Sequence, residues 1–285
     1  MKANLSRYRR TVAYALGTLS CAMTVFSCPP AQAQTRLRAH YTISMTGVSV
    51  GQIAWLSAIG DQRYTTSANG KASGVLSVLV NGEGSVDARG LIADGRLVPK
   101  SFVSTVTDDE GKAELRITFD DGVVKELVAP PPPPGSDRVP VKDTDLRSVA
   151  DPLSAMLISA GDDKLAAANC NHVLSIFDGQ RRYDLALSYR RVDKVALERS
   201  YSGLVLVCVV VLQPIAGYRA DSKLVKYVAG RRDMELWFAP IAGTPVIAPI
   251  RVLMPTLLGT LEIAADQFDT IAAPLPPAET LRVPQ

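Results

Sequence analysis

The residues with the most chemistry to offer are a cysteine and a histidine that lie close together in the sequence. Cys170 and His172 stand two positions apart in the run Asn-Cys-Asn-His. In an extended strand, residues i and i+2 point to the same face, so the imidazole could activate the thiol as a nucleophile. His40, the other histidine, stands at the start of the first predicted strand and is interpreted as a surface or edge residue.

Other signatures of catalysis are missing from the sequence. It contains no Gly-x-Ser-x-Gly elbow, no phosphate-binding loop with its lysine and no complete dinucleotide-binding glycine loop. Its cysteines and histidines lack the paired spacing of a zinc site, and its Asp-rich turns are too short for a calcium loop. We therefore predict no catalytic residue, no metal and no cofactor. A hydrolase whose carboxylate pair is distant in sequence stays open as an alternative.

The N-terminal 33 residues have the three parts of a secretory signal peptide. A basic start is followed by an apolar stretch over 11–26 and by Ala31-Gln32-Ala33, whose small residues suit signal peptidase. The apolar stretch is shorter than the about 20 residues that a membrane-spanning helix needs. We predict cleavage between Ala33 and Gln34, export to the periplasm and no transmembrane span in the mature chain.

Two variants of this export route stay open. Cys28 could be the acylated cysteine of a lipoprotein, although the bulky Phe26 suits that motif poorly. Arg9 and Arg10 could belong to a twin-arginine signal, although the residues that follow match its hydrophobic run poorly.

The formal charge of +3 depends on this N-terminal segment. The whole chain carries 31 Lys plus Arg against 28 Asp plus Glu. Four of the basic residues and none of the acidic ones lie in residues 1–33, which leaves 27 against 28, a net charge of −1. A nearly neutral mature protein has no electrostatic reason to bind nucleic acid.

The use of cysteine agrees with export. Cys21 and Cys28 leave with the signal peptide, so Cys170 and Cys208 are the two that remain. An even number of cysteines in an oxidising compartment predicts a disulfide between them. We favour this pairing over a nucleophilic role for Cys170.

The mature chain has the pattern of an all-β protein. Apolar and polar residues alternate with a period of two from residue 37 onward, and turn residues separate the alternating runs. Strands are predicted over 41–45, 48–58, 63–73, 83–92, 97–106, 112–119, 123–129, 172–177, 182–192, 204–213, 233–239, 245–253 and 257–268. We expect a mainly antiparallel fold, either one large curved sheet or a partly open barrel, with one or two short helices.

We expect this β-rich domain to span 34–270 and to be followed by a disordered tail at 271–285. A proline-rich loop is predicted at 130–140, because proline has no N–H to donate to a sheet. The valine-rich run 204–213 predicts a central strand that is buried on both faces.

One helix has clear signals in the sequence. Asp151 is a suitable N-cap, and Pro152 suits the first helical position. Leu153, Met156 and Leu157 have helical spacing for packing on a core, and Gly161 is placed to end the helix.

Several short motifs occur in an order that resembles the exported bacterial proteins grouped as domain of unknown function 3108. They are Tyr-x-Ile at 41–43, Gly-x-Ile at 51–53, Asp-Gly-x-Leu-x-Pro-x-x-Phe at 94–102, Asp-Pro-Leu-Ser at 151–154, Phe-Asp-Gly-x-Arg-x-Tyr at 177–183 and Glu-Leu-Trp-Phe at 235–238. The resemblance covers roughly 38–268. It implies a β-rich fold and a place in the cell envelope, and it supplies no catalytic residue.

The function that we expect is binding without catalysis. A curved sheet could hold an apolar ligand, a glycan or a partner protein on its concave face. Trp55, Tyr183, Trp237 and Phe238 are the candidate ligand-binding side chains, with packing in the core as the alternative for each. A structural or assembly factor of the cell envelope is the second hypothesis.

Overall fold

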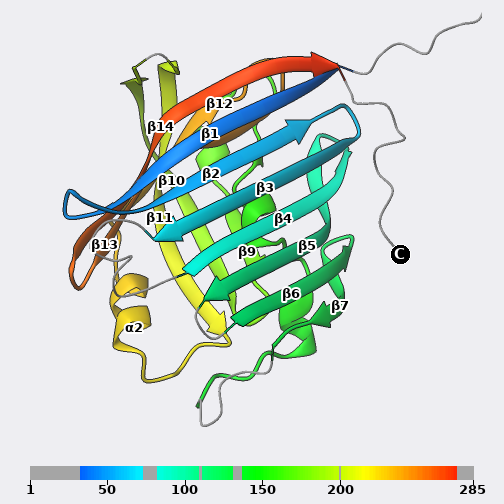
Figure 1. Cartoon of the computed structure of the whole chain (residues 1–285), viewed down its shortest axis with the longest axis vertical. Helices are drawn as coiled ribbons and strands as arrows, with labels where there is room; N and C mark the ends of the chain where they lie inside the picture. The colour runs from blue at the N-terminus through cyan, green and yellow to red at the C-terminus, as the bar shows by residue number, and fades with distance from the viewer. Residues whose placement is uncertain (1–32, 73–81, 109–110, 131–136, 199, 275–285) are drawn as a thin grey trace, which may run out of the picture. The chain divides into compact units, whose positions relative to one another are not determined.

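The computed structural model describes residues 33–72, 82–108, 111–130, 137–198 and 200–274. The chain divides into a unit at Met1–Ala31, which is not described, and a unit at Gln32–Gln285 that contains the whole sheet. The all-β prediction is confirmed, because fourteen strands form a single antiparallel sheet that does not close into a barrel (Figure 1).

The strands fall into an N-terminal and a C-terminal group. The first group is β1 (Ala33–Met45), β2 (Val48–Ile59), β3 (Arg63–Ala72), β4 (Gly82–Ala93), β5 (Arg96–Asp108), β6 (Gly111–Asp120) and β7 (Val123–Val128). The second group is β8 (Ile158–Ser159), β9 (Val173–Phe177), β10 (Arg182–Ala196), β11 (Ser202–Ala216), β12 (Met234–Pro240), β13 (Val246–Thr256) and β14 (Gly259–Pro274). The described helices are η2 (Asp143–Leu146), α1 (Pro152–Ala155), η3 (Ala167–Cys170) and α2 (Lys223–Ala229).

The two groups of strands are joined where the first strand, β1, pairs with the last strand, β14. Along the sheet the order is β7-β6-β5-β4-β3-β2-β1-β14-β13-β12-β11-β10-β9, and β8 pairs with β13. Strand β1 pairs with β14 along its whole length, from Ala33 opposite Pro274 to Met45 opposite Leu261. As a result, the strands at the two edges of the sheet, β7 and β9, come from the middle of the sequence.

Local sequence explains the tight turns of the first group. Asp94 and Gly95 both have positive φ, at 49° and 70°, and so do Asp121 and Gly122, at 46° and 73°. Two-residue hairpins need this backbone, which glycine adopts without strain and aspartate tolerates. These Asp-Gly pairs therefore form the predicted turns between β4 and β5 and between β6 and β7.

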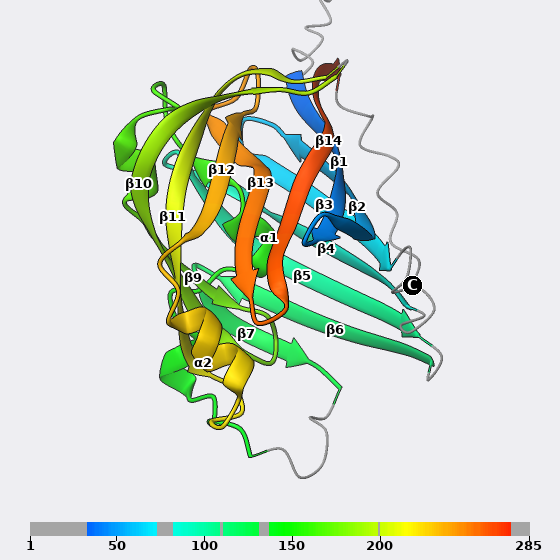
Figure 2. The same cartoon turned by 90° about the vertical axis from the view of Figure 1, so that its left-hand side faces the viewer.

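The sheet bends so that its two halves form two layers (Figure 2). Side chains from both layers meet in an inner core cluster. Tyr41 and Trp55 come from the N-terminal strands, whereas Val205, Val207 and Trp237 come from the C-terminal strands. The phenol of Tyr41 donates a hydrogen bond to the carbonyl oxygen of Pro249 at 2.7 Å, which ties β1 to β13.

Strand β11 is buried on both faces, as the valine-rich run predicts, and it pairs with a strand on each side, although it lies nearer the β9 edge than the centre of the sheet. Val205, Leu206, Val207 and Cys208 are all 0% exposed. The side chains of Val205 and Val207 belong to the inner core cluster, and those of Leu206 and Cys208 belong to an outer cluster. Helix α2 contributes Val228 to the outer cluster, so this face of β11 is covered as well.

A segment between β7 and β9, which we call the crossing segment (residues 149–155), connects the two edges of the sheet. The N–H of Val149 donates to the carbonyl of Gly122, in the β6–β7 turn, at 2.9 Å. The N–H of Ala150 donates to Ser175 of β9, and the carbonyl of Ala150 accepts from Phe177, both at 2.9 Å. Helix α1 then lies between the two layers of the sheet (Figure 2).

The predicted helix is shorter than expected. Its N-cap is Asp151 and its first residue is Pro152, as predicted, but α1 ends at Ala155 rather than near Gly161. The reason is that Ile158 and Ser159 form β8, which pairs with β13. Helix α2 is not among the elements predicted from the sequence; its N-cap, Ser222, accepts a hydrogen bond from the N–H of Val225 at 3.3 Å.

Two predicted segments lie partly outside the described residues. Strand β14 continues to Pro274, so its last four residues occupy the start of the segment that was expected to be a disordered tail. Residues 275–285 are not described, and neither are residues 131–136, which include most of the proline run. Within the described ranges, the helices are too short or too polar to cross a membrane.

The predicted disulfide between Cys170 and Cys208 is confirmed, with the two Cα atoms 5.5 Å apart. It links η3 to the buried strand β11 across a sequence separation of 38 residues. We expect the double variant Cys170→Ala/Cys208→Ala to lose about 4 kcal/mol of unfolding free energy, because the open chain gains entropy when unfolded. Urea unfolding of both proteins, with and without reductant, measures this loss.

Reductant is also the control for this prediction. It should lower the midpoint of the wild-type protein and leave that of the double variant unchanged. Equal midpoints for the oxidised wild type and the double variant would contradict the prediction.

Candidate ligand-binding site

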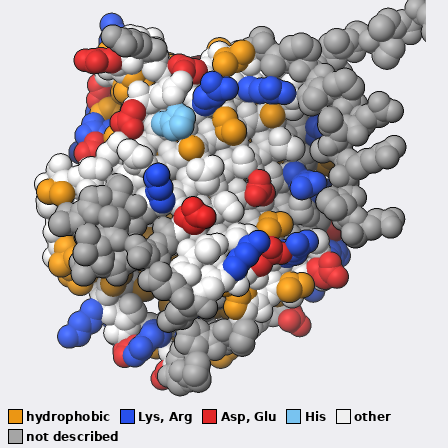
Figure 3. All heavy atoms as spheres, in the orientation of Figure 1, with side chains coloured by type: hydrophobic (Ala, Val, Ile, Leu, Met, Phe, Trp, Pro, Cys, Tyr) orange, Lys and Arg blue, Asp and Glu red, His pale blue; other side chains and the backbone are white. Residues whose placement is uncertain are grey.

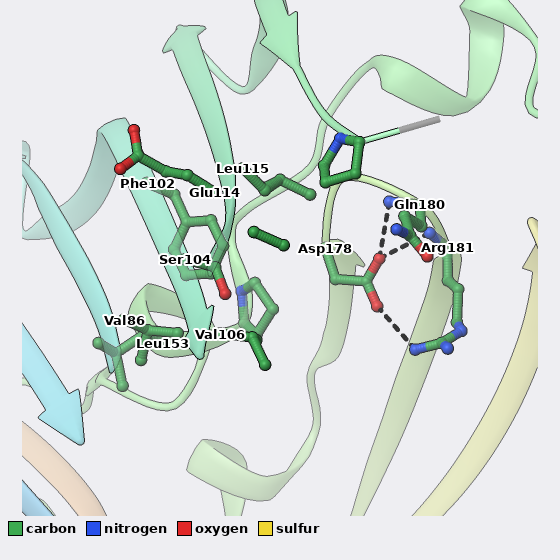
Figure 4. A pocket seen from close by; sticks show the side chains of 13 residues that line it. Val86, Phe102, Ser104, Val106, Glu114, Leu115, Leu153, Asp178, Gln180 and Arg181 are labelled. Atoms are coloured by element: carbon green, nitrogen blue, oxygen red, sulfur yellow. Dashed lines mark hydrogen bonds and ion pairs between the residues drawn. The ribbon is translucent and has the colours of Figure 1, made fainter. Parts of the chain in front are cut away.

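The candidate site is a pocket of about 460 Å³ with a mostly apolar lining, on the inner face of β4, β5 and β6 (Figure 4). We call it the inner pocket. It is lined by Val86, Phe102, Ser104, Val106, Ala113, Glu114, Leu115, Pro130, Pro152, Leu153, Asp178, Gln180 and Arg181. Most of these side chains are apolar, and besides the three strands they come from Pro130, from the start of α1 and from the turn between β9 and β10.

Strand register explains the first wall of the pocket. Ser104 on β5 lies opposite Val86 on β4 and opposite Leu115 on β6, so the three side chains form one row on the same face. Val106 and Ala113 pair in the next row. Because side chains alternate along a strand, this wall follows from the period-two pattern of three neighbouring strands.

The turn between β9 and β10, which we call the Asp178 turn (residues 178–181), forms the second wall. The Asp178 carboxylate accepts hydrogen bonds from the backbone N–H groups of Gln180 at 2.9 Å and Arg181 at 2.6 Å. Gly179 has a φ of +94°, and a Cβ at this position would collide with the side chain of Leu115. Glycine therefore lets the turn pack directly on β6.

The crossing segment forms the third wall through Pro152 and Leu153. Asp151 holds this wall in place, since its Oδ1 accepts from the N–H groups of Leu153 at 3.0 Å and Ser154 at 2.8 Å. The Ser154 hydroxyl accepts a hydrogen bond from the phenol of Tyr64 on β3 at 2.8 Å. The segment is thus fastened to the N-terminal layer by buried polar contacts.

The Asp151 carboxyl is unusual because it is 0% exposed and its Oδ2 has no hydrogen-bond partner. Burial favours the neutral form of a carboxyl group. The pKa of Asp151 is accordingly raised from 3.8 to about 6, although its hydrogen bonds with Ser154 and Leu153 act in the opposite direction.

The inner pocket is suited to binding an apolar group. Of its described lining residues, Ser104 alone carries a hydroxyl, and none is a histidine or a cysteine. Its charged residues are paired. Arg181 bonds to Asp178 at 3.5 Å, and Glu114 accepts from Arg116 at 2.5 Å. The walls can therefore shield an apolar group from water, while the charged groups already have partners within the protein.

Trp237, a predicted ligand-binding residue, lies in the inner core cluster at 8% exposure. Its indole N–H donates to the buried Glu235 carboxylate at 2.6 Å. The guanidinium groups of Arg191 and Arg251 each lie 5.0 Å from the ring centroid, a distance at which cation–π attraction operates. The ring is thus enclosed by side chains of the protein itself.

The other three predicted residues lie in separate places. Trp55 belongs to the inner core cluster and donates to Thr66 at 2.6 Å, whereas Phe238 is 0% exposed in the outer cluster. Tyr183 lies on β10, where burial and the nearby Asp178 carboxylate raise the pKa of its phenol. The two tryptophans share the inner core cluster, Phe238 and Tyr183 lie outside it, and none of the four lines the inner pocket.

Sequence reasoning missed most of the residues that line the pocket, but the motifs contained a signal. Phe102, the pair Pro152 and Leu153, and the Asp178 turn belong to three of the motifs quoted for the family resemblance, at 94–102, 151–154 and 177–183. These motifs are distant in sequence and meet in space at the inner pocket (Figure 4). Their shared location could not be derived from the sequence without the topology.

The described residues contain no cluster of three or more His, Cys, Asp or Glu side chains arranged to hold a metal ion. Cys170 is bonded to Cys208. The thiol considered as a nucleophile in the sequence analysis is therefore not free.

The raised pKa of Asp151 predicts how stability depends on pH. The folded protein holds this proton more tightly than the unfolded chain, so the contribution is greatest below about pH 4 and is lost as pH rises through about 6. The difference between pKa values of 3.8 and about 6 corresponds to about 3 kcal/mol. Relative to Asp151→Asn, the wild type should lose about this much stability between pH 4 and 7, measured by urea unfolding.

Asp120→Asn is the matched control. The Asp120 carboxylate is exposed, and its hydrogen bond with Lys100 lowers its pKa. The stability of the wild type relative to this variant should therefore rise with pH, the opposite direction. A difference between wild type and Asp151→Asn that stays constant across this pH range would show that the buried carboxyl has an ordinary pKa.

Comparison with known proteins identifies a family. A family model described as protein of unknown function (DUF3108) matches residues 40–266. A solved structure from Brucella abortus, a beta-barrel-like protein of domain of unknown function DUF1849, is similar with a TM-score of 0.42 and 9% sequence identity. That similarity covers 84% of this chain and 98% of the other. No curated protein matches the chain. Because the family model spans most of the sheet-forming residues, the chain belongs to the DUF3108 family.

Proposed function

We propose that this protein is an exported binding protein, without catalytic activity, that holds an apolar ligand such as an acyl chain in the inner pocket. The observation that carries the proposal is the apolar wall of β4, β5 and β6, which faces the Asp178 turn across a space of about 460 Å³. This volume lies within the range of roughly 300–1,000 Å³ that is typical of small-molecule sites.

The free energy gained by burying apolar groups in this space is large enough to support binding. Val106, on the wall of the pocket, is 47% exposed, so apolar surface faces water there. Burial of one methylene group contributes about 0.8 kcal/mol, so a segment of about eight methylenes would contribute about 6 kcal/mol before the cost of association. An apolar chain is therefore a better match for these walls than a charged ligand.

Export is supported by the position of the sheet in the sequence. Strand β1 begins at Ala33, and the division between the two units of the chain falls after Ala31. Cleavage between Ala33 and Gln34 would leave all but the first residue of β1 in the mature protein. The disulfide between Cys170 and Cys208 also suits an oxidising compartment.

Filling the pocket tests the binding proposal. Ser104 lies in the row of side chains that faces the pocket, so Ser104→Trp should occupy the space and lower affinity for a fluorescent fatty acid at least about tenfold, a change of about 1.4 kcal/mol. The matched control is Ser101→Trp, which places the same ring on the opposite face of β5. Titration of the purified proteins by fluorescence measures both affinities.

The control variant, Ser101→Trp, should bind the fluorescent fatty acid as the wild type does. Circular dichroism should show the same β content in the wild type and both variants. If the wild type binds no fatty acid, or if Ser101→Trp and Ser104→Trp weaken binding equally, the inner pocket is not the site.

The export proposal has its own test. When the full chain is expressed in a bacterium with a periplasm, the mature protein should appear in the periplasmic fraction with Gln34 as its first residue, as shown by N-terminal sequencing. The bulky side chain of Ala33→Leu should slow processing. A product that begins at Cys28 with a lipid-sized mass increase would instead support the lipoprotein alternative, and an unprocessed cytoplasmic chain would contradict export.

A further inference from the structure

A second hollow, of about 640 Å³, lies on the other side of the N-terminal strands, and we call it the outer groove. Figure 3 views the molecule from this side, where charged side chains are scattered over a surface of backbone and uncharged side chains. The groove crosses β1 to β6, so it runs across the strands rather than along one of them. It is separate from the inner pocket and shares none of its lining residues.

Alternation along the strands places the groove on the outer face. Ile53 packs against the inner core cluster, so its neighbours Gln52 and Ala54 point the other way. The groove is lined by Gln52 and Ala54 and also by Ile53, Gly70 and Gly84, which lie between the outward-pointing residues. Its floor is therefore the backbone of the sheet, and its sides are two rows of outward-pointing side chains.

Cross-strand pairing defines the first row. His40 lies opposite Ala54, Ala54 opposite Asn69, Asn69 opposite Ser85, and Ser85 opposite Thr105. Neighbouring strands are about 4.8 Å apart, so this row presents side chains at that interval across five strands.

The second row runs parallel to the first, two residues along each strand. Gln52 lies opposite Lys71, Lys71 opposite Glu83, Glu83 opposite Thr107, and Thr107 opposite Lys112. Together the rows form a regular array of amide, hydroxyl, amine and carboxylate groups on six consecutive strands.

These polar groups are available to a ligand. Within the described part of the chain, the side chains of the two rows make no hydrogen bond or ion pair with other residues. Two other lining residues have partners: Asp266, at the end of the groove, accepts a hydrogen bond from Thr42 at 2.9 Å, and the phenol of Tyr41 donates to Pro249. The formal charges balance, with Lys71 and Lys112 against Glu83 and Asp266.

We propose that the outer groove binds a linear, uncharged, hydroxyl-rich chain, that is, a neutral oligosaccharide. Side chains with both donors and acceptors suit hydroxyl groups, which donate and accept in the same way. Ala54 is the one apolar side chain in the two rows, so an apolar ligand gains little here. The balanced charge gives no advantage to nucleic acid or another polyanion. The strand interval is comparable with the length of a sugar ring, so successive rings contact successive strands.

The affinity expected from such a site is low. The rows contain no tryptophan, tyrosine or phenylalanine on which a sugar ring could stack. Hydrogen bonds that replace bonds to water contribute little each, so we expect a dissociation constant on the order of 1 mM for a hexasaccharide.

Nuclear magnetic resonance titration of the purified protein with maltohexaose, cellohexaose and chitohexaose tests the proposal. At least one of the three should shift backbone amide signals of β2 to β5 around the groove. Ser85→Leu, within the first row, removes a hydroxyl and adds a branched side chain that offers no ring for a sugar to stack on, so it should weaken this binding at least about tenfold. The control is Ser67→Leu, which places the same side chain on the outer face of β3 but outside the groove, and it should bind as the wild type does.

Three outcomes would overturn the proposal. The first is the absence of shifts with all three hexasaccharides at millimolar concentration, and the second is shifts that map to another surface. The third is equal binding by Ser85→Leu and the wild type. Ser104→Trp in the inner pocket should leave saccharide binding unchanged, so failure at one site is distinguishable from failure at the other.

Discussion

The pairing of β1 with β14 is the contact on which the rest of the fold depends. It joins two meanders that are each antiparallel and consecutive in sequence, and it converts them into one sheet. Because the first and last strands, β1 and β14, meet in the centre of this sheet, the strands at its edges come from the middle of the sequence. The crossing segment connects those strands, so it passes between the layers, where Pro152 and Leu153 become a wall of the inner pocket.

Burial of a carboxyl group within this segment illustrates how a polar residue can be retained in a core. Asp151 satisfies two backbone N–H groups at the start of α1, which would otherwise be unpaired. Its second oxygen has no partner, and the raised pKa is the energetic consequence. The cap thus positions the pocket wall at some cost in stability above about pH 6, which is consistent with a segment kept for its geometry.

The sequence was most informative where the structure is determined by local preferences. Asp94-Gly95 and Asp121-Gly122 specify their turns, and the valine-rich run specifies β11, because these features depend on residues close together in the chain. The pairing of cysteines followed from their number. The inner pocket could not be predicted, since Ser104 and Leu115 are ordinary strand residues until the topology places the Asp178 turn opposite them. The aromatic residues were the obvious candidates for a ligand site, but the structure buries the large side chains of Trp237 and Phe238 in the core.

The position of β7 at one edge of the sheet has a consequence for how the protein behaves in a crowded solution. An unpaired strand edge can accept a strand from a second molecule, which is a route to aggregation. Strand β7 is only six residues long, carries the exposed charges of Lys125 and Glu126, and is followed shortly by Pro130, whose nitrogen cannot donate. These features limit the backbone that a second molecule could pair with, so the edge is protected against self-association even though Leu127 and Val128 are exposed there.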